Sequence, residues 1–165
     1  MLTMRPATLD DVPVLREWDS RPHIIDIMGD DDASEWETEL ACATQWHEPQ
    51  WKWDLIAEVD GKPIGVVQII DPHREAEHYW GDVEPNLRAI DIWIGEVEYL
   101  GQGYGSVMMA TALDFCYADP TVTGVLIDPL VSNIRARKFY EKMGFEFVEY
   151  RTFGTDNCAV YEHTR

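Results

Sequence analysis

The sequence predicts an α/β protein with one mixed, mostly antiparallel sheet and helices on both of its faces. Strand-like runs of β-branched and aromatic residues alternate along the chain with segments whose apolar residues recur at helical spacing. A turn signal, Asp60-Gly61-Lys62, lies between two of the strand-like runs and indicates a tight hairpin. At 165 residues, 45% of them hydrophobic, the chain is long enough for one domain with a sizeable core. We therefore expect a single domain over residues 1–165.

The first part of the chain is expected to form one strand and three helices. Thr8 and Asp11 resemble a capping box at the start of the first helix, with Pro13 in or near its first turn. Ser34 is the expected N-cap of the third and acidic helix. The expected elements are a strand over 2–7 and helices over 9–18, from 21 to near Gly29, and over 35–46.

The remainder is expected to supply most of the sheet. Residues 71–86 contain proline, glycine and charge without a period, which indicates a loop over one face. Gly144 is placed to end the last helix at the C′ position. The expected strands are 51–59, 62–70, 87–96, 124–129, 145–151 and 157–163, and the expected helices run from about 104 to 118 and over 133–143.

The charge of the chain excludes some partners. Thirteen basic and thirty-one acidic residues give a net charge of −18, and such a field repels nucleic acid and anionic membranes while it attracts cations. Solubility or adaptation to salt is the simpler explanation of the same composition. The first residues contain no apolar stretch typical of a signal peptide, and no apolar run approaches the length of a membrane span. We expect a soluble, cytoplasmic protein that binds neither nucleic acid nor membrane.

Cysteine and histidine spacing gives no indication of a metal site. Cys42, Cys116 and Cys158 match neither a zinc pattern nor a disulfide framework, and they are more typical of buried thiols in a reducing compartment. The five histidines lack the spacing of paired ligands, so no metal is expected.

A glycine-rich turn, "YLGQGYG" at 99–105, lies between the expected strand 87–96 and the helix that follows. A helix N-terminus offers unpaired N–H groups, and glycines let the backbone approach a ligand closely. The turn lacks the Lys-Ser/Thr ending of a P-loop and the G-x-G-x-x-G spacing of a dinucleotide site. From these residues alone, a phosphate cradle and a plain tight turn are both possible.

The surrounding motifs resemble those of the GCN5-related N-acetyltransferase (GNAT) superfamily. The family pattern Gln/Arg-x-x-Gly-x-Gly/Ala maps onto 100–105, with Leu100 in place of the usual Gln or Arg. The more specific pattern N-x-x-A-x-x-x-Y-E-K-x-G-F is complete from Asn133 to Phe145. The stretch 79–105, with "DP" at 128–129 and "AVYE" at 159–162, is similar to aminoglycoside 6′-N-acetyltransferases. A similar stretch occurs in acyltransferases that modify hydroxylamines in siderophore synthesis.

The resemblance implies the GNAT fold and a site for acetyl-CoA. Its pyrophosphate would lie on the glycine turn, and a backbone N–H at 94–96 would polarise the thioester carbonyl, on a strand that splays from its neighbour. Asn133 would cap its helix and hydrogen-bond pantetheine or a water, although a cap needs no other function. The implied set is Ile94, Gly95, Glu96, Gly101, Gln102, Gly103, Tyr104, Gly105, Ser106, Asn133 and Ala136.

Two residues are candidates for the chemistry of acetyl transfer. Asp91 interrupts an apolar strand, where a carboxylate is costly to bury, and the resemblance implies that it acts as the base for the amine, directly or through water. The alternative is an ion pair with Arg88 or another base inside the fold. The resemblance implies that Tyr140 is the acid for the departing thiolate; the alternative is an ordinary core tyrosine.

A polycationic substrate requires several spaced carboxylates, which form charge-assisted hydrogen bonds with its ammonium groups. The substrate-binding set that the resemblance implies is Trp80, Asp82 or Glu84, Asp91, Asp128 and Asp156. Trp80 would form an apolar wall against a sugar ring. Trp46, Trp51 and Trp53 either do the same from the other side or fill the core, and the run Asp30 to Asp32 is more typical of a solvated loop.

These observations predict an acetyl-CoA-dependent aminoglycoside 6′-N-acetyltransferase, which would confer resistance by direct transfer in a ternary complex. Two alternatives stay open. One is a GNAT acyltransferase that acts on another small amine or a hydroxylamine, and the other is a non-catalytic module that binds acetyl-CoA or cations. The expected partner is a small cationic molecule, and the expected assembly is a monomer or a weak dimer.

Overall fold

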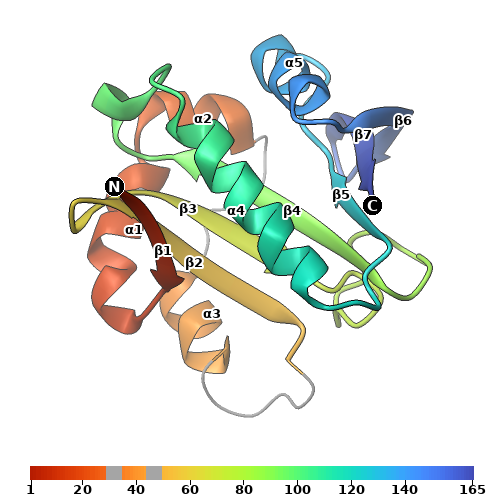
Figure 1. Ribbon diagram of the computed structural model, residues 1–165, viewed down its shortest axis with the longest axis horizontal. Coiled ribbons are helices and arrows are strands. Elements are labelled where there is room, and N and C mark those ends of the chain that lie inside the picture. The colour runs from red at the N-terminus through yellow and green to blue at the C-terminus, as the bar shows by residue number, and fades with distance from the viewer. Residues whose placement is uncertain (29–34, 44–49) are drawn as a thin grey trace.

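The computed structural model describes residues 1–28, 35–43 and 50–165. A seven-stranded sheet in the order β1-β2-β3-β4-β5-β7-β6 forms its centre. Every neighbouring pair is antiparallel except β4 and β5. Helices cover both faces of the sheet (Figure 1), so the predicted fold class is confirmed.

The elements follow the predicted order. The strands are β1 (Leu2–Pro6), β2 (Lys52–Val59), β3 (Lys62–Ile70), β4 (Leu87–Ile94), β5 (Gly124–Ile127), β6 (Glu146–Phe153) and β7 (Asp156–Thr164). The helices are α1 (Val12–Asp19), α2 (Pro22–Met28), α3 (Trp36–Ala43), α4 (Tyr104–Ala118) and α5 (Ile134–Lys142). A short 3₁₀ helix, η1 (Leu9–Asp11), forms the start of the helix expected over 9–18. A second, η2 (Val97–Tyr99), was not predicted from the sequence.

Local sequence signals explain several boundaries. Asp60 and Gly61 both have positive φ, 51° and 80°, and form the tight β2–β3 turn. The Asp11 carboxylate accepts the Thr8 N–H at 2.8 Å, as a capping box requires, and Pro13 lies in the first turn of α1. Gly144, at φ 93°, follows α5 in the left-handed conformation that ends many helices.

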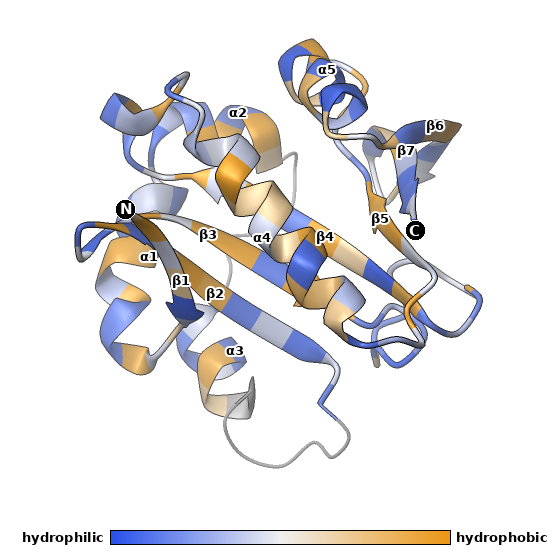
Figure 2. Ribbon diagram, in the orientation of Figure 1, coloured by the Kyte–Doolittle hydropathy of each residue, from blue (hydrophilic) through white to orange (hydrophobic). Residues whose placement is uncertain are grey.

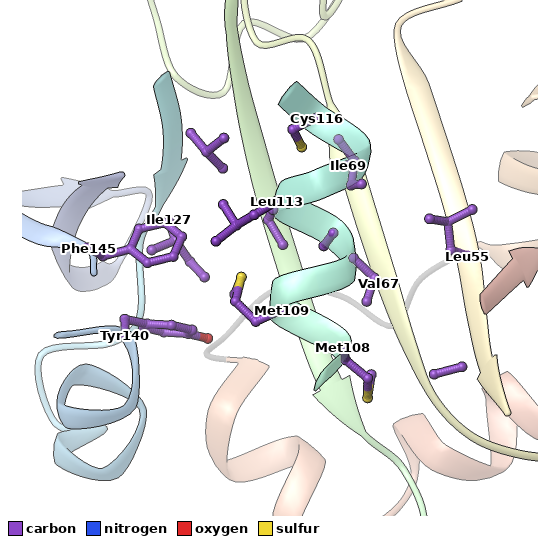
Figure 3. Close-up of a cluster of buried hydrophobic side chains, with 14 of the residues drawn as sticks. Leu55, Val67, Ile69, Met108, Met109, Leu113, Cys116, Ile127, Tyr140 and Phe145 are labelled. Atoms are coloured by element: carbon purple, nitrogen blue, oxygen red, sulfur yellow. The ribbon is translucent and has the colours of Figure 1, made fainter. Parts of the chain in front are cut away.

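Two apolar clusters pack on the two faces of the sheet. On one face, α4 covers a cluster that includes Val67, Ile90 and Met109 (Figure 3). On the other face, α1, α2 and α3 cover a second cluster that contains Ile56 and Trp93. Figure 2 shows apolar residues along β3 and β4, the strands that α4 follows in this view. Alternation along β4 places successive side chains on opposite faces, and both of these faces are packed.

The sheet opens between β4 and β5. Their parallel pairing covers only Leu87–Ala89 against Gly124–Leu126, although β4 continues to Ile94. Beyond this point the strands diverge, and β5, β6, β7 and α5 form a separate wing beside α4 (Figure 1). Among the described residues, the C-terminal half of β4 therefore has one edge without a neighbouring strand, as the resemblance implied.

Several sequence predictions fall outside the described residues. These concern Gly29, the acidic run 30–32, Ser34, Trp46 and the side chain of Cys42. Cys116 and Cys158 are buried, as predicted. In the parts of the chain that the structure describes, no helix combines the length and the apolar character needed to span a membrane.

Candidate active site

A large cleft lies where the sheet opens, between β4 and the wing formed by β5, β6, β7 and α5. Its volume is about 1330 Å³, and it extends from α2 and α3 past β4 to α5. Of the residues predicted from the sequence, the cleft is lined by Trp80, Asp91, Ile94, Gly101, Gly103, Gly105, Ser106, Asp128, Asn133, Ala136, Tyr140 and Asp156. The predicted residues Asp82, Glu84, Gly95, Glu96, Gln102 and Tyr104 are not in this lining.

The glycine turn forms one end of the cleft. Gly101 and Gly103 have φ of 73° and 89°, and Gly103 is the N-cap of α4. The left-handed conformation, rather than crowding, requires glycine here, because a Cβ at either position would meet no atom within 4 Å. The first N–H groups of α4 therefore face the cleft end with partial positive charge, an arrangement that suits an anion.

Two of the side chains in the predicted turn point elsewhere. The Gln102 amide donates to the Glu98 carbonyl, and the Tyr104 ring packs on Tyr99 with ring centroids 5.4 Å apart. Any contact that Gln102 or Tyr104 makes with a ligand in the cleft would come from the backbone. The sequence pattern could not separate these backbone contributions from side-chain ones.

The predicted backbone donors at 94–96 are not equivalent. The N–H groups of Gly95 and Glu96 donate to the Ile64 carbonyl, at 2.9 and 3.2 Å. Because backbone direction alternates along a strand, the amides of Ile92 and Ile94 face the open edge instead. Gly95 lies against Trp18, whose ring atoms would lie 2.1 Å from an added Cβ. Of the predicted three, only Ile94 has an N–H directed into the opening.

Asp91 lies in the middle of β4 and its side chain is exposed to the cleft. The sequence argument from the cost of burial is therefore wrong for this residue, because the strand loses its neighbour here and the carboxylate meets solvent. The alternative pairing with Arg88 is also not observed. Arg88 makes its ion pairs with Asp71 and Asp119, at 3.4 and 3.2 Å.

Tyr140 lies on the opposite side of the opening, on α5. Only 7% of its surface is exposed, and its ring packs edge-on against Phe139 and Phe145. In Figure 3 its hydroxyl points from α5 toward α4. Burial raises the pKa of this phenol, and the charges of Asp91 and Asp128 raise it further. The hydroxyl therefore keeps its proton at neutral pH and is available to donate it.

Asn133 caps α5 as predicted. Its Oδ1 accepts the Ala136 N–H at 3.1 Å, and both residues line the cleft. The cap fixes the start of the helix that carries Tyr140 two turns further on.

Asp128 lies just after β5 and is held by an aromatic neighbour. The Tyr79 hydroxyl donates to its Oδ2 at 2.7 Å, and the Tyr79 ring stacks on Phe153 with centroids 4.5 Å apart. Burial raises the pKa of Tyr79, and the Asp128 charge raises it further. Tyr79 therefore stays a donor, and it orients the Asp128 carboxylate at the cleft wall.

The loop 71–86 differs most from the prediction. Asp82 and Glu84 are exposed but lie away from the cleft lining. Trp80 reaches the cleft, yet it is only 4% exposed and packs in a third apolar cluster with Leu126. The acids that this loop contributes to the lining are instead Glu75 and Glu77.

Many other cleft residues were not foreseen. They include His23, Lys52, Gln68, Glu75, Glu77 and Tyr79. The His23 Nε2 lies 3.1 Å from the Ile94 carbonyl, at the open edge of β4. Of these residues, only Tyr79 carried a sequence signal, because it adjoins the predicted Trp80 in an aromatic-acidic stretch. Trp51 also lines the cleft, whereas Trp53 packs on Phe115, so the two tryptophans have different roles.

A polar row crosses the sheet beside Asp91. Asp54 on β2 lies opposite Gln68 on β3, and Gln68 lies opposite Asp91 on β4, so the three side chains share one face of the sheet. The Gln68 amide donates to Asp54 at 2.8 Å. Burial raises the pKa of Asp54 despite the nearby Lys52 ammonium, which pairs with Glu39 at 2.5 Å. Burial also lowers the pKa of Lys52, but the charges of Asp54, Glu39 and Asp91 raise it more.

The fold and the cleft together define an acetyltransferase. A family profile described as "Acetyltransferase (GNAT) domain" matches residues 7–153, and the chain belongs to this family. It is 31% identical over 151 residues to aminoglycoside N(6′)-acetyltransferase type 1 of Klebsiella pneumoniae, across 88% of this chain and 74% of the relative. It is 26% identical over 172 residues to the lysine N-acyltransferase MbtK of Mycolicibacterium paratuberculosis, across 96% of this chain and 71% of the relative.

Solved structures are similar over the whole chain. The structure of aminoglycoside acetyltransferase AAC(6′)-Ib with coenzyme A and kanamycin matches with a TM-score of 0.86 and 28% identity, over 100% of this chain and 95% of that one. AAC(6′)-Ib with ribostamycin and coenzyme A matches with a TM-score of 0.87 and 29% identity, over 99% and 93%. The recognition of the family from its motifs is confirmed.

Proposed function

We propose that this protein transfers the acetyl group of acetyl-CoA to the 6′-amine of aminoglycosides, and thereby confers resistance to them. The observation that carries the proposal is the meeting of three groups in one cleft. Asp91 on β4, Asp128 after β5 and Tyr140 on α5 line the same cleft, and the glycine turn borders it. Acetyl transfer from a coenzyme A thioester to a cationic amine requires an acid, a pair of carboxylates and an anion-binding site. Here these are Tyr140, Asp91 with Asp128, and the glycine turn.

The residues present fit acetyl-CoA. The α4 N-terminus, opened by Gly101 and Gly103 at positive φ, suits the pyrophosphate. The unpaired edge of β4 suits an extended amide-containing arm, because the Ile92 and Ile94 N–H groups face it. When bound there, acetyl-CoA would supply an activated acetyl group. The relatives that were solved with coenzyme A support this assignment.

The other wall of the cleft fits a cationic acceptor. Asp91, Asp128 and Asp156 line it, together with Glu75 and Glu77. Spaced carboxylates hold a polyamine sugar by charge-assisted hydrogen bonds, and they would aim one amine at the opening. The relatives that were solved with kanamycin and ribostamycin support aminoglycosides as the substrate class. Removal of the charge on the 6′-amine would weaken the binding of such a drug to RNA phosphates.

The roles of the two central residues follow from their environments. A primary amine is mostly protonated at neutral pH, so the solvent-exposed Asp91 carboxylate would accept its proton, directly or through water. Tyr140 keeps its proton because burial and two carboxylates raise its pKa, and it would donate that proton to the departing thiolate.

A thiol-release assay tests the proposal. We expect free thiol to appear when the protein is mixed with acetyl-CoA and kanamycin, amikacin or tobramycin. Gentamicin components that differ in substitution at the 6′ position should differ in rate. Thiol release with none of these drugs would reject the proposed function.

A second candidate is acylation of a hydroxylamine or another small amine. The similarity to the lysine N-acyltransferase MbtK favours this candidate. N-hydroxylysine and a peptide amine in the same assay distinguish the two, because the hydroxylamine reaction would release thiol with N-hydroxylysine but not with kanamycin. Binding of kanamycin by calorimetry without thiol release from any acceptor would indicate a non-catalytic module.

A further inference from the structure

The corner between α1 and α2, residues 18–23, holds the end of β4 through two backbone carbonyls. The Arg21 guanidinium donates to the Gly95 carbonyl at 2.7 Å. The His23 Nε2 atom lies 3.1 Å from the carbonyl oxygen of Ile94. Because a carbonyl oxygen can only accept a hydrogen bond, this contact assigns a proton to Nε2. Two consecutive residues at the end of the strand are therefore fixed by one helical corner.

The corner itself is held rigidly against the strand. The Trp18 ring is fully buried, and its atoms would lie 2.1 Å from a Cβ added to Gly95, so the corner packs directly on β4. The Trp18 indole N–H donates to the Glu96 carboxylate at 3.0 Å, and Arg21 pairs with the same carboxylate at 3.1 Å. The backbone around His23 therefore keeps a fixed distance from β4, as a side chain that orients a peptide group requires.

The Ile94 carbonyl needs such a partner because it faces the open edge of β4. The Gly95 N–H donates to the Ile64 carbonyl on β3, so the N–H and the carbonyl of Ile94 both face away from β3. Pairing of β4 with β5 ends at Ala89, well before Ile94. In a complete sheet the next strand would donate an N–H to this carbonyl. His23 supplies the donor that the diverging strand does not.

We propose that His23 is a positioning residue for acetyl transfer, which fixes the direction of the Ile94 N–H toward the thioester carbonyl. This rests on the proposed function and adds a residue to it. The N–H and the carbonyl of Ile94 leave the same Cα toward the same edge, so a bond that holds the carbonyl also limits the rotation of the N–H. The His23 ring lines the cleft, and it acts through the backbone rather than on the reacting atoms.

The expected effect is on turnover rather than on binding. When the amine adds to the thioester, the carbonyl oxygen gains negative charge, and a donor already aimed at it stabilises the transition state more than the bound substrate. Removal of one such donor typically costs about 10²- to 10³-fold in kcat. Loss of the His23 bond misaligns the Ile94 N–H without removing it, so we expect kcat to fall about ten-fold. The KM for acetyl-CoA and the KM for kanamycin should stay within about two-fold of the wild type.

Three variants of His23 separate the hydrogen bond from the shape of the side chain. His23→Phe keeps a flat ring and loses the donor. In His23→Gln the amide nitrogen is as many bonds from the backbone as Nε2 of histidine, so the bond to the Ile94 carbonyl can form again. In His23→Asn the amide nitrogen is one bond nearer to the backbone and falls short of the carbonyl. We expect kcat to be low in His23→Phe and His23→Asn and to recover in His23→Gln.

A spectroscopic measurement on bound acetyl-CoA tests the alignment without any acceptor. Acetyl-CoA labelled with ¹³C at the thioester carbonyl is bound to each variant, and the labelled carbon is observed by NMR. A donated hydrogen bond polarises the carbonyl and moves its resonance downfield from the free value. We expect this displacement in the wild type and in His23→Gln, and a smaller one in His23→Phe and His23→Asn. Affinity for coenzyme A without the acetyl group, measured by calorimetry, should be the same in the wild type and the variants.

The control is Ser20→Ala, which removes another side-chain bond to a backbone carbonyl from the same corner. The Ser20 hydroxyl donates to the Glu17 carbonyl at 2.7 Å, and Ser20 lies outside the cleft lining. Ser20→Ala should leave kcat and the carbonyl resonance unchanged, because this bond does not touch β4.

The outcomes separate the role of His23 from the proposed function. Equal kcat and equal carbonyl resonance in the wild type, His23→Phe and His23→Asn would overturn the positioning role while acetylation stands. So would a wild-type resonance at the free value. If His23→Phe does not fold, the comparison of His23→Gln with His23→Asn decides in its place. If acetyl-CoA binds but kanamycin is not acetylated, the proposed function fails, and the carbonyl resonance still decides the role of His23. Absence of acetyl-CoA binding to the wild type would overturn both.

Discussion

Replacement of Tyr140 by phenylalanine isolates one hydroxyl from the rest of the site. The side chain is 7% exposed and packs on Phe139 and Phe145, with ring centroids 5.3 and 5.9 Å away. Phenylalanine keeps this packing and removes only the oxygen. Since burial and then the charges of Asp91 and Asp128 keep the phenol protonated, the variant loses a proton donor and no negative charge.

The two effects of Tyr140→Phe differ in size. Loss of a general acid typically lowers turnover by about 10²- to 10⁴-fold. Loss of one hydroxyl with retained packing changes the free energy of unfolding by about 1 kcal/mol. We therefore expect kcat for kanamycin acetylation to fall at least about 100-fold. The KM for either substrate and the thermal melting midpoint should change little.

The assay is thiol release under saturating acetyl-CoA, with thermal melting by circular dichroism on the same samples. Tyr150→Phe is the matched control, because Tyr150 is 62% exposed on β6 and outside the cleft. A Tyr140→Phe variant whose kcat stays close to that of the wild type would refute the assignment of Tyr140 as the acid.

Three further predictions address other parts of the site. Asp91→Asn should lower kcat with kanamycin at least about ten-fold at neutral pH, and turnover equal to the wild type would eliminate Asp91 as the base. Gly103→Ala places a Cβ on a residue at φ 89°, so it should lower the free energy of unfolding by about 1 kcal/mol. It should also raise the KM for acetyl-CoA more than the KM for the drug. An unchanged KM for acetyl-CoA would contradict the binding of the pyrophosphate by the glycine turn. Asp54→Asn should raise the melting midpoint at pH 7, because burial raises the pKa of Asp54 and its ionised form opposes folding. This gain in the melting midpoint should vanish as the pH falls and Asp54 of the wild type takes up a proton. A lower midpoint for the variant at pH 7 would contradict the prediction.

The fold could be predicted because its signals are local. The strand periods, the Asp60-Gly61 turn and the Thr8–Asp11 capping box each depend on a few neighbouring residues, and each is present in the structure. The Asn133 cap is equally local. The short helix η2 was missed because three residues after a strand carry no period.

The site could be predicted only in part, because its members meet through long-range packing. Asp91, Asp128 and Tyr140 came from motif resemblance, and the structure places them in one cleft. Glu75 and Glu77 could not be separated from Asp82 and Glu84 in the sequence, since the path of an irregular loop is set by tertiary contacts such as the Asp71 ion pairs. Likewise, no pattern in the sequence shows that the amides of Gly95 and Glu96 already pair with Ile64.

The regiochemistry of the product tests the central claim most directly. The protein is incubated with acetyl-CoA and kanamycin, and the product is examined by mass spectrometry and by NMR. We predict one added acetyl group, carried by the 6′ nitrogen, with one free thiol released per drug molecule. Acetylation at another amine would contradict the proposed function. So would the absence of acetylated kanamycin from a protein that acylates N-hydroxylysine.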